Sequence, residues 1–259
     1  MKKPIEITHL VVNGCSFTYC QGLEDPKTQG WPALVAKKLG VPVINLAARG
    51  SGNDAIFRRN YEYFYLNKNL DNKPFWITAW SFAARREEYF DTYRDLPLND
   101  FQTLSLKDGN TLEKEIVMNI MTPKGLLACE RKKMLHWAAC LELFKNNNIP
   151  YLITEYMPTL DEAIIDYLRI NFPTQYNTVY EDDNKITNLS QFSKLYSQHQ
   201  LPCGHDGLPA MEPIANYVYE QITKRYDVTV KAPAKGFVDL EGYRTDTEGM
   251  HESNVWRNK

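Results

Sequence analysis

The stretch ITHLVVNGCSFT, residues 7–18, runs from an apolar segment directly into Asn13-Gly14, and Ser16 follows two positions later. An apolar run that ends at Asn-Gly is typical of a buried strand that stops at a turn. A serine directly after a strand can act as a nucleophile at the edge of a sheet, but it can equally cap a helix or stabilise a turn. Ser16 is therefore the first candidate site residue, and both interpretations are open.

Helical and strand-like segments alternate along the chain. Residues 31–40 (WPALVAKKLG) have apolar side chains at helical spacing, with a proline near the start and a glycine at the end. The continuous hydrophobicity of residues 74–83 (PFWITAWSFA) predicts a strand covered on both faces, as in a parallel sheet. Further strands are predicted at 41–47 and 149–158, and further helices at 54–66, 124–148, 159–172, 188–198 and 211–226. This order predicts an α/β fold built on a parallel sheet.

Two segments depart from this alternation. Residues 85–124 are polar and charged and are predicted to form a long excursion or a small subdomain, and loops of that length are usually functional. Residues 227–259 are polar and poor in periodic structure, which predicts an extended C-terminal tail. The main domain is therefore expected to span residues 1–226.

Composition narrows the class of protein. The 259 residues include 30 Lys and Arg against 32 Asp and Glu, a net charge of −2, which gives no reason to expect a nucleic acid or a membrane as a partner. No segment approaches the roughly 18 consecutive apolar residues of a membrane span, and no signal peptide is recognisable. Five irregularly spaced cysteines are typical of reduced thiols inside a cell. We expect a cytoplasmic location in the producing cell and no cofactor.

Several candidate residues are expected at one edge of the sheet. In an open α/β sheet, ligands bind beyond the carboxyl ends of the strands. Gly50 and Asn53 follow the second predicted strand, and Trp80 and Ser81 lie near the end of the third. Together with Ser16 they are expected to face one site, where backbone N–H groups, including that of Gly50, can hold an oxyanion.

The segments NGCSFTYCQGLE, WPALVAKKLG, NLAARGSGNDAIFRR and WITAWSFAARREE resemble, in order and spacing, the SGNH (GDSL-type) hydrolases, and especially the branch often encoded by bacteriophages. The resemblance covers residues 9–90 and 126–225. It implies a flavodoxin-like three-layer α/β/α domain whose members hydrolyse esters, often acyl or acetyl groups on lipids or glycans. It also implies that Ser16 corresponds to the nucleophile and Gly50 to the oxyanion glycine.

Two of the family's sequence blocks are absent. The Gly-x-Asn-Asp expected after the third strand is replaced by AWSFAARREE, with Trp80 and Ser81 at the position of the asparagine donor. Asn53 lies too early to be that block, although its amide could reach the same pocket. The Asp-x-x-His expected before the last helix is replaced by CGHDGLPAMEPIANYV, in which neither register supplies the histidine. A serine hydroxyl without a neighbouring base is a poor nucleophile at neutral pH.

His205 and Asp206 admit three interpretations. His205 could act as the base in a reshaped loop, with Asp206 or another carboxylate orienting it, because catalytic roles are defined by geometry. His199, Cys203, His205 and Asp206 are also zinc-ligand types, but their spacing matches no metal motif, and we expect no metal. The plainest interpretation is a pair of solvated loop residues.

Two functions from different classes follow. The first is a serine esterase that acts on glycan or lipid esters, with Ser16 as nucleophile and His205 as base. The second is a hydrolase fold with an impaired or atypical site, kept for binding or as a phage virion component, with protein partners on residues 227–259. The intact GCSFT favours the first function, and the two missing blocks favour the second. On balance the sequence favours the second.

Overall fold

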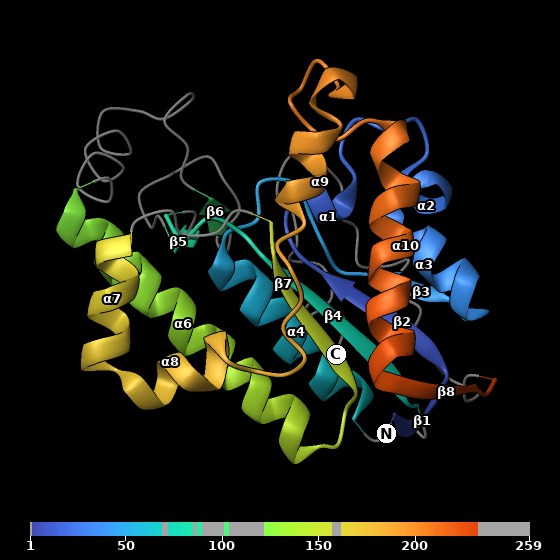
Figure 1. Ribbon diagram of the computed structural model, residues 1–259, viewed down its shortest axis with the longest axis horizontal. Helices are drawn as coiled ribbons and strands as arrows, with labels where there is room; N and C mark the ends of the chain where they lie inside the picture. The colour runs from blue at the N-terminus through green and yellow to red at the C-terminus, as the bar shows by residue number, and fades with distance from the viewer. Residues whose placement is uncertain are drawn as a thin grey trace.

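The computed structural model describes residues 2–68, 72–84, 122–156 and 162–232, and the backbone of two short strands at 87–89 and 101–103. Its centre is a four-stranded parallel sheet with the order β3-β2-β4-β7 (Figure 1). The strands are β2 (His9–Asn13), β3 (Val43–Asn45), β4 (Pro74–Trp80) and β7 (Tyr151–Glu155). The predicted parallel sheet is thus confirmed.

The strand order reverses at β2. The chain leaves β2 to form β3 on one side and then crosses back to form β4 on the other, so that Val12 pairs with both Asn45 and Ile77. At the far edge, a bridge between Ile153 and Lys185 continues the sheet beyond β7. A reversal of this kind opens a crevice beyond the carboxyl ends of the strands, where ligands of doubly wound folds bind.

Helices cover both faces of the sheet (Figure 1). One face packs against α3 (Trp31–Leu39) and α10 (Leu208–Arg225), and the other against α4 (Asn53–Asn67), α6 (Pro123–Asn146) and α8 (Pro173–Tyr180). Successive strand residues face opposite layers. Leu10 and Val12 therefore enter one core cluster while Val11 enters the other. This explains why β2 and β7 are buried at every position, and it confirms the three-layer α/β/α prediction.

Smaller elements complete the described chain. They are α1 (Ser16–Tyr19), α2 (Pro26–Gln29), α7 (Glu162–Asn171), α9 (Ser190–Leu195), the 3₁₀ turn η1 (Ser197–His199), β5 (Glu87–Tyr89) and β6 (Phe101–Thr103). The antiparallel pair β5–β6 lies in the predicted excursion, of which the remaining residues up to 121 lie outside the described part. The short helices α2 and α8 were not predicted, because neither has a pronounced apolar face.

The predicted tail begins as a strand. β1 (Lys3–Ile7) pairs in parallel with β8 (Tyr226–Val230), with Ile5 opposite Val228. Regular structure therefore continues past the expected boundary at residue 226, through β8. The pairing joins the two ends of the domain, so no local pattern could predict it. The tail beyond residue 232 lies outside the described residues.

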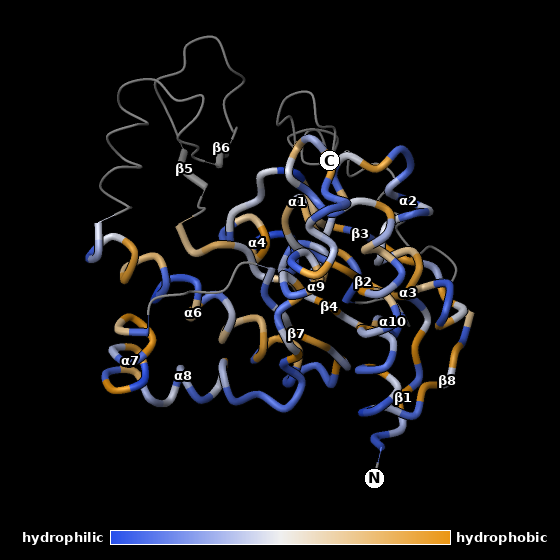
Figure 2. The backbone as a smooth tube through the Cα atoms, turned by 45° about the horizontal axis from the view of Figure 1, so that its top comes forward, coloured by the Kyte–Doolittle hydropathy of each residue, from blue (hydrophilic) through white to orange (hydrophobic). Residues whose placement is uncertain are grey.

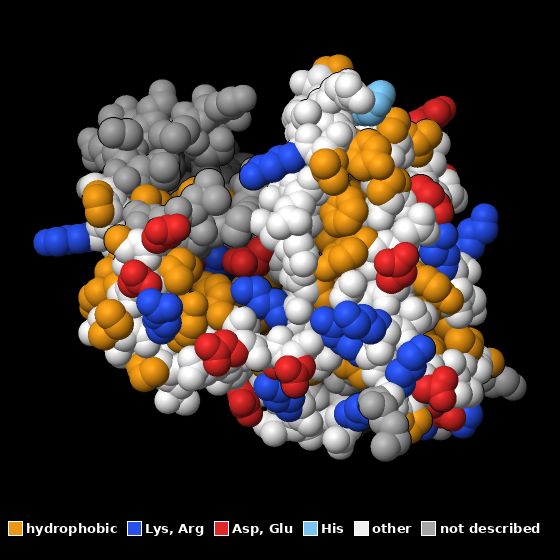
Figure 3. Space-filling view, viewed as in Figure 1, with side chains coloured by type: hydrophobic (Ala, Val, Ile, Leu, Met, Phe, Trp, Pro, Cys, Tyr) orange, Lys and Arg blue, Asp and Glu red, His pale blue; other side chains and the backbone are white. Residues whose placement is uncertain are grey.

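Helix α6 is the longest helix described, with 24 residues. Hydrophobic and hydrophilic stretches alternate along it in Figure 2, as expected of a helix that buries one face. Among the residues that the structure covers, no helix combines the length and the apolar character needed to cross a membrane. The face shown in Figure 3 carries Lys and Arg side chains interspersed with Asp and Glu.

Candidate active site

Ser16 begins α1, just beyond the end of β2. Gly14 permits this sharp turn, since a Cβ there would overlap Thr18 and lie 2.9 Å from the Ala79 carbonyl oxygen of β4. The Asn13 side chain fixes the turn, because its Oδ1 accepts a hydrogen bond from the Gly14 N–H at 2.8 Å. Ser16 is only 3% exposed at this edge of the sheet.

The Nε2 of His205 lies 2.7 Å from the Oγ of Ser16. This distance is that of a hydrogen bond, and it is the geometry in which an imidazole can take the proton of a serine hydroxyl. The two residues are 189 positions apart in the sequence. The fold thus brings together the serine and the histidine that the sequence singled out separately.

Tight backbone contacts hold the loop that carries His205. The Leu201 N–H donates to the His205 carbonyl oxygen at 2.8 Å, and the Gly204 N–H donates to the Leu201 carbonyl oxygen at 2.8 Å. Gly204 has a φ of 78°, a left-handed conformation that favours glycine. Gly207 closes the loop where a Cβ would overlap the carbonyl oxygen of His199. The loop conformation that carries His205 therefore depends on Gly204 and Gly207.

Aromatic packing holds the imidazole ring beside the serine. The Phe17 and His205 ring centroids are 4.7 Å apart, and the Phe17 and Tyr156 centroids are 5.0 Å apart. Phe17 directly follows Ser16, so one segment of α1 carries the hydroxyl and also supports its partner. Figure 1 shows α1 and α9, which precedes the histidine loop, at the same end of the sheet.

Asp206 does not bond to His205. Its Oδ2 accepts hydrogen bonds from the Ser193 Oγ at 2.9 Å and the Tyr156 hydroxyl at 3.3 Å, while its Oδ1 has no hydrogen-bond partner among the described residues. Burial raises the pKa of the Asp206 carboxyl, and the bonds from Ser193 and Tyr156 partly offset this rise. The expected role of orienting His205 is therefore corrected: Asp206 anchors its loop to α9 and to the end of β7. In an Asp-x-x-His motif the aspartate lies three residues before the histidine. Pro202 occupies that position relative to His205, so the motif's carboxylate is absent from this loop.

Two backbone donors lie at the start of α1. The Cys15 carbonyl oxygen accepts from the N–H groups of Thr18 and Tyr19, at 3.0 and 2.9 Å. The first N–H groups of a helix, here those of Ser16 and Phe17, have no acceptor within the helix itself. They are therefore suited to stabilise negative charge that develops beside the Ser16 Oγ.

Gly50 lies in the turn that follows β3. Its φ is 69°, which favours glycine at this position. The N–H and the Oγ of Ser51 both donate to the Ala48 carbonyl oxygen, at 3.4 and 2.9 Å, and close the turn. Arg59 of α4 is buried and donates to the Ser51 Oγ at 2.6 Å. The hydrogen bond from Arg59 of α4 thus stabilises the turn that contains Gly50.

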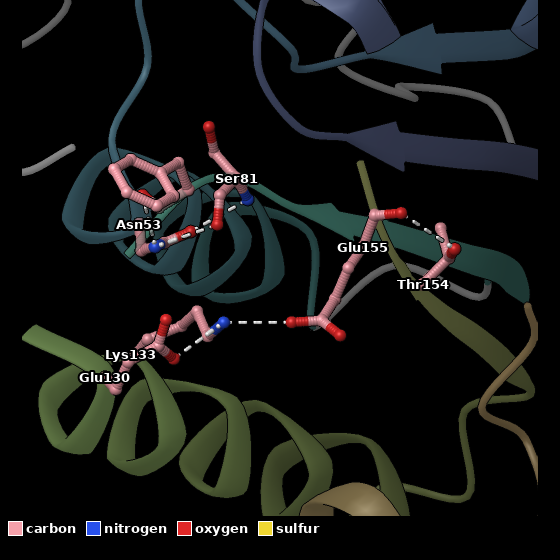
Figure 4. A network of polar contacts seen from close by, with 7 residues as sticks. Asn53, Ser81, Glu130, Lys133, Thr154 and Glu155 are labelled. Atoms are coloured by element: carbon pink, nitrogen blue, oxygen red, sulfur yellow. Dashed lines mark hydrogen bonds and ion pairs between the residues drawn. The ribbon is translucent and has the colours of Figure 1, made fainter. Parts of the chain in front are cut away.

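The other predicted oxyanion residues have a different role. The Asn53 Nδ2 donates to the carbonyl oxygens of Ser81 and Phe82 at 3.3 and 3.2 Å, and its Oδ1 accepts from the Ser81 N–H at 2.9 Å (Figure 4). These bonds join α4 to the end of β4 and occupy the donors of Asn53 and the N–H of Ser81. Trp80 is fully buried and stacks on Trp137. We therefore do not assign these residues as oxyanion donors or as substrate contacts.

The residues near His205 that could bind zinc are not placed to coordinate one ion. Cys203 is exposed and faces the Gln21 carbonyl oxygen, and His199 contacts Gln198 at 3.3 Å. Within the described ranges, no group of three or more His, Cys, Asp or Glu side chains is placed to hold a metal ion.

A buried charge cluster lies behind the site, where α6 meets the end of β7. The Lys133 Nζ is 2.8 Å from the Glu130 Oε2 and 2.9 Å from the Glu155 Oε1 (Figure 4). Burial lowers the pKa of Lys133, but the charges of Glu155 and Glu130 outweigh burial and hold that pKa above its ordinary value. Lys133 is thus a buried cation paired with two carboxylates.

Sequence reasoning missed several residues that shape the site. Tyr156 lies at the polar end of a predicted strand, which was a usable signal because site residues follow strand ends. Ser193 and Arg59 are polar residues inside helical patterns and carried no such signal. Their roles depend on which loops their helices face.

The comparisons with known proteins agree with this architecture. No protein-family profile and no curated protein matches the sequence. Among solved structures, the psychrotrophic esterase EstA from Pseudoalteromonas sp., inhibited by monoethylphosphonate, superposes with a TM-score of 0.50 and 13% identity, over 84% of this chain and 97% of that chain.

Two further structures are similar. A member of the lipolytic G-D-S-L family from Veillonella parvula has a TM-score of 0.45 and 9% identity, over 84% of this chain and 99% of that chain. A lipase/acylhydrolase from Enterococcus faecalis has a TM-score of 0.45 and 13% identity, over 85% and 97%. The likeness to the Pseudoalteromonas esterase agrees with the three-layer α/β/α fold that the resemblance to the SGNH (GDSL-type) hydrolases implies. At such identities the likeness establishes the fold, and the activity must be argued from the site.

Proposed function

We propose that the protein is a serine ester hydrolase with Ser16 as nucleophile and His205 as general base. The observation that carries this proposal is the 2.7 Å contact between the Ser16 Oγ and the His205 Nε2. A serine hydroxyl becomes an effective nucleophile when an adjacent base takes its proton. The reshaped loop supplies such a base although the family's Asp-x-x-His is absent.

The first half of the reaction acylates the serine. The Ser16 Oγ attacks the ester carbonyl carbon while its proton passes to the His205 Nε2. Negative charge develops on the carbonyl oxygen, and the N–H groups of Ser16, Phe17 and Gly50 are the proposed donors that stabilise it. When the intermediate collapses, the bond to the alcohol oxygen breaks and His205 returns its proton to that oxygen.

The second half regenerates the enzyme. A water molecule gives a proton to the His205 Nε2 and attacks the acyl carbon, and the bond to the Ser16 Oγ then breaks. His205 returns the proton to Ser16 and the acid leaves. Both halves require the imidazole to stay beside the hydroxyl, which the packing of Phe17 on His205 favours.

We further propose small acyl or acetyl esters on glycans or lipids as the substrate class. This substrate class follows from the resemblance to the SGNH (GDSL-type) hydrolases. The fold shared with the Pseudoalteromonas esterase supports ester hydrolysis in general, and the phosphonate inhibitor of that enzyme supports the choice of a phosphonate probe. The alternative, a degenerate fold kept for binding or as a phage virion component, needs no base beside Ser16. The Ser16–His205 contact favours the hydrolase over that alternative.

Labelling with a fluorophosphonate probe tests the proposal, together with hydrolysis of 4-nitrophenyl acetate. We expect the protein to be labelled, Ser16→Ala to abolish labelling, and His205→Ala to reduce labelling and hydrolysis by about 1,000-fold or more. His199→Ala is the matched control, since His199 belongs to the same region but lies on the exposed turn η1. Folded protein that is neither labelled nor active, or labelling that persists in Ser16→Ala, would contradict the proposal.

A further inference from the structure

An arginine lies beside α1, the short helix that Ser16 begins. The Cζ of Arg49 is 5.4 Å from the centroid of the Tyr19 ring. Tyr19 is the last residue of α1, which Ser16 begins, and residues three apart on a helix are neighbours, with Cβ atoms about 5–6 Å apart. Arg49 also directly precedes Gly50. The guanidinium of Arg49 therefore contacts α1 through Tyr19. The backbone of Arg49 is part of the turn that contains Gly50, the proposed oxyanion donor.

The segment that carries Arg49 is docked on α1. The Asn45 Nδ2 donates to the Thr18 carbonyl oxygen at 3.3 Å, and its Oδ1 accepts from the Ala47 N–H at 3.1 Å. On the other side of Arg49, Ser51 closes the turn and is held by Arg59. Arg49 is thus an exposed side chain on a fixed backbone, which limits the positions that its charge can occupy.

Apart from its contact with the Tyr19 ring, the charge of Arg49 has no carboxylate partner among the described residues. In the part of the chain that the structure describes, no Asp or Glu lies within ion-pair distance of Arg49, whereas other exposed cations such as Lys38 and Lys73 pair with Glu212 and Glu6. The contact with the Tyr19 ring restrains the guanidinium of Arg49, which still carries a fork of N–H donors. In this arrangement arginine recognises carboxylate and phosphate groups.

We propose that Arg49 makes this site selective for esters that carry a negatively charged group, a carboxylate or a phosphate, close to the scissile bond. The inference rests on the proposed hydrolase function and adds the charge of the substrate to it. Arg49 binds the anionic group, while Ser16 and His205 act on the ester.

The test uses pairs of esters that differ only in charge. The first pair, 4-acetoxybenzoate and 4-acetoxybenzamide, places the charge in the alcohol part. The second pair, monomethyl terephthalate and methyl 4-carbamoylbenzoate, places it in the acid part. For each pair the measured quantity is the ratio of kcat/KM for the anionic ester to kcat/KM for the neutral ester, because this ratio cancels general losses of activity.

We expect the wild-type ratio to exceed one for at least one pair, and Arg49→Gln to lower that ratio about tenfold, as for a lost charged hydrogen bond at an exposed position. Raising NaCl to about 0.5 M should lower the wild-type ratio, because salt screens exposed charges. Arg131→Gln is the matched control: Arg131 is also exposed and stacked on a ring, that of Phe172 at 4.4 Å, but it lies on α6.

Two results would overturn the inference: ratios at or below one in both pairs, or a ratio that Arg49→Gln leaves unchanged. In either case hydrolysis of the neutral esters and fluorophosphonate labelling would still support the hydrolase. Folded protein without labelling and without hydrolysis of any of the four esters would instead contradict the proposed function, and this inference with it.

Discussion

At the scale of single residues, the chemistry depends on where His205 points. His205 precedes Asp206, the reverse of the order in an Asp-x-x-His motif, and the neighbouring carboxylate therefore faces Ser193 and Tyr156. The imidazole reaches Ser16 because Gly204 and Gly207 let the loop turn tightly. Base and carboxylate have separate tasks here, in that His205 contacts the nucleophile and Asp206 anchors the loop.

Replacing Asp206 by asparagine distinguishes an anchor from a member of a catalytic triad. The asparagine side chain would retain a carbonyl oxygen that can accept from Ser193 and Tyr156, so we expect kcat to fall less than about tenfold. If Asp206 oriented His205 through its charge, the same substitution would lower kcat by about 10⁴-fold. Steady-state kinetics of Asp206→Asn beside Asp206→Ala decide between the two, and the alanine variant should be the less stable protein.

At the scale of elements, the site depends on how helices are fixed to strand ends. Arg59 of α4 holds the turn after β3 through Ser51, and Asn53 holds the end of β4. Lys133 of α6 reaches Glu155 at the end of β7. Each contact joins a helix to the carboxyl end of a strand, so the edge that carries the site is fixed by buried polar side chains rather than by apolar packing alone.

The Lys133 cluster gives a stability prediction. Lys133→Met leaves the Glu130 and Glu155 carboxylates buried without their cation, and we expect the free energy of unfolding to fall by about 3–5 kcal/mol. Lys38→Met, which removes a partly exposed partner of Glu212, should lower it by less than about 1 kcal/mol. Urea unfolding of both variants checks this. Equal decreases in the free energy of unfolding in the two variants would contradict this prediction, because the buried cluster would then stabilise the fold no more than an exposed ion pair.

At the scale of the whole molecule, the two ends of the sheet differ. The carboxyl end carries Ser16, His205 and Gly50, while His9 is buried at the opposite end, at the start of β2. The His9 Nε2 lies 3.0 Å from the Tyr63 hydroxyl, and burial lowers the pKa of His9 from 6.5 to about 4. The folded protein therefore keeps this imidazole neutral at pH values where the unfolded chain protonates it.

This difference predicts how stability depends on pH. Between the folded pKa of about 4 and the unfolded pKa of 6.5, only the unfolded chain binds the proton. The free energy of unfolding should thus fall as pH decreases through this window, by about 3 kcal/mol in total from this residue. Denaturant unfolding at pH 4.5, 5.5 and 7 should show a smaller decrease in His9→Gln than in the wild type. His199→Gln, on an exposed turn, should retain the full decrease, and a His9→Gln curve parallel to the wild type would contradict the assignment.

The fold was largely predictable because it depends on local patterns. Continuous apolar runs at β2, β4 and β7, separated by amphipathic helices, are sufficient to predict a parallel sheet covered on both faces. The pairing of β1 with β8 was not predictable, because the two strands lie at opposite ends of the domain and neither has a partner nearby in sequence. Ser16 and Gly50 were found as candidates from strand ends and from the resemblance.

The sequence by itself determined the three-layer architecture, the placement of Ser16 after the first central strand, and the absence of the expected Asp-x-x-His. Only the tertiary structure decided that His205 lies against Ser16, that Asp206 bonds elsewhere, and that Asn53 and Ser81 bond each other. The physical reason is that strand and helix patterns arise between neighbours in sequence. The direction of a loop side chain depends instead on contacts between segments far apart, such as the 189 positions between Ser16 and His205.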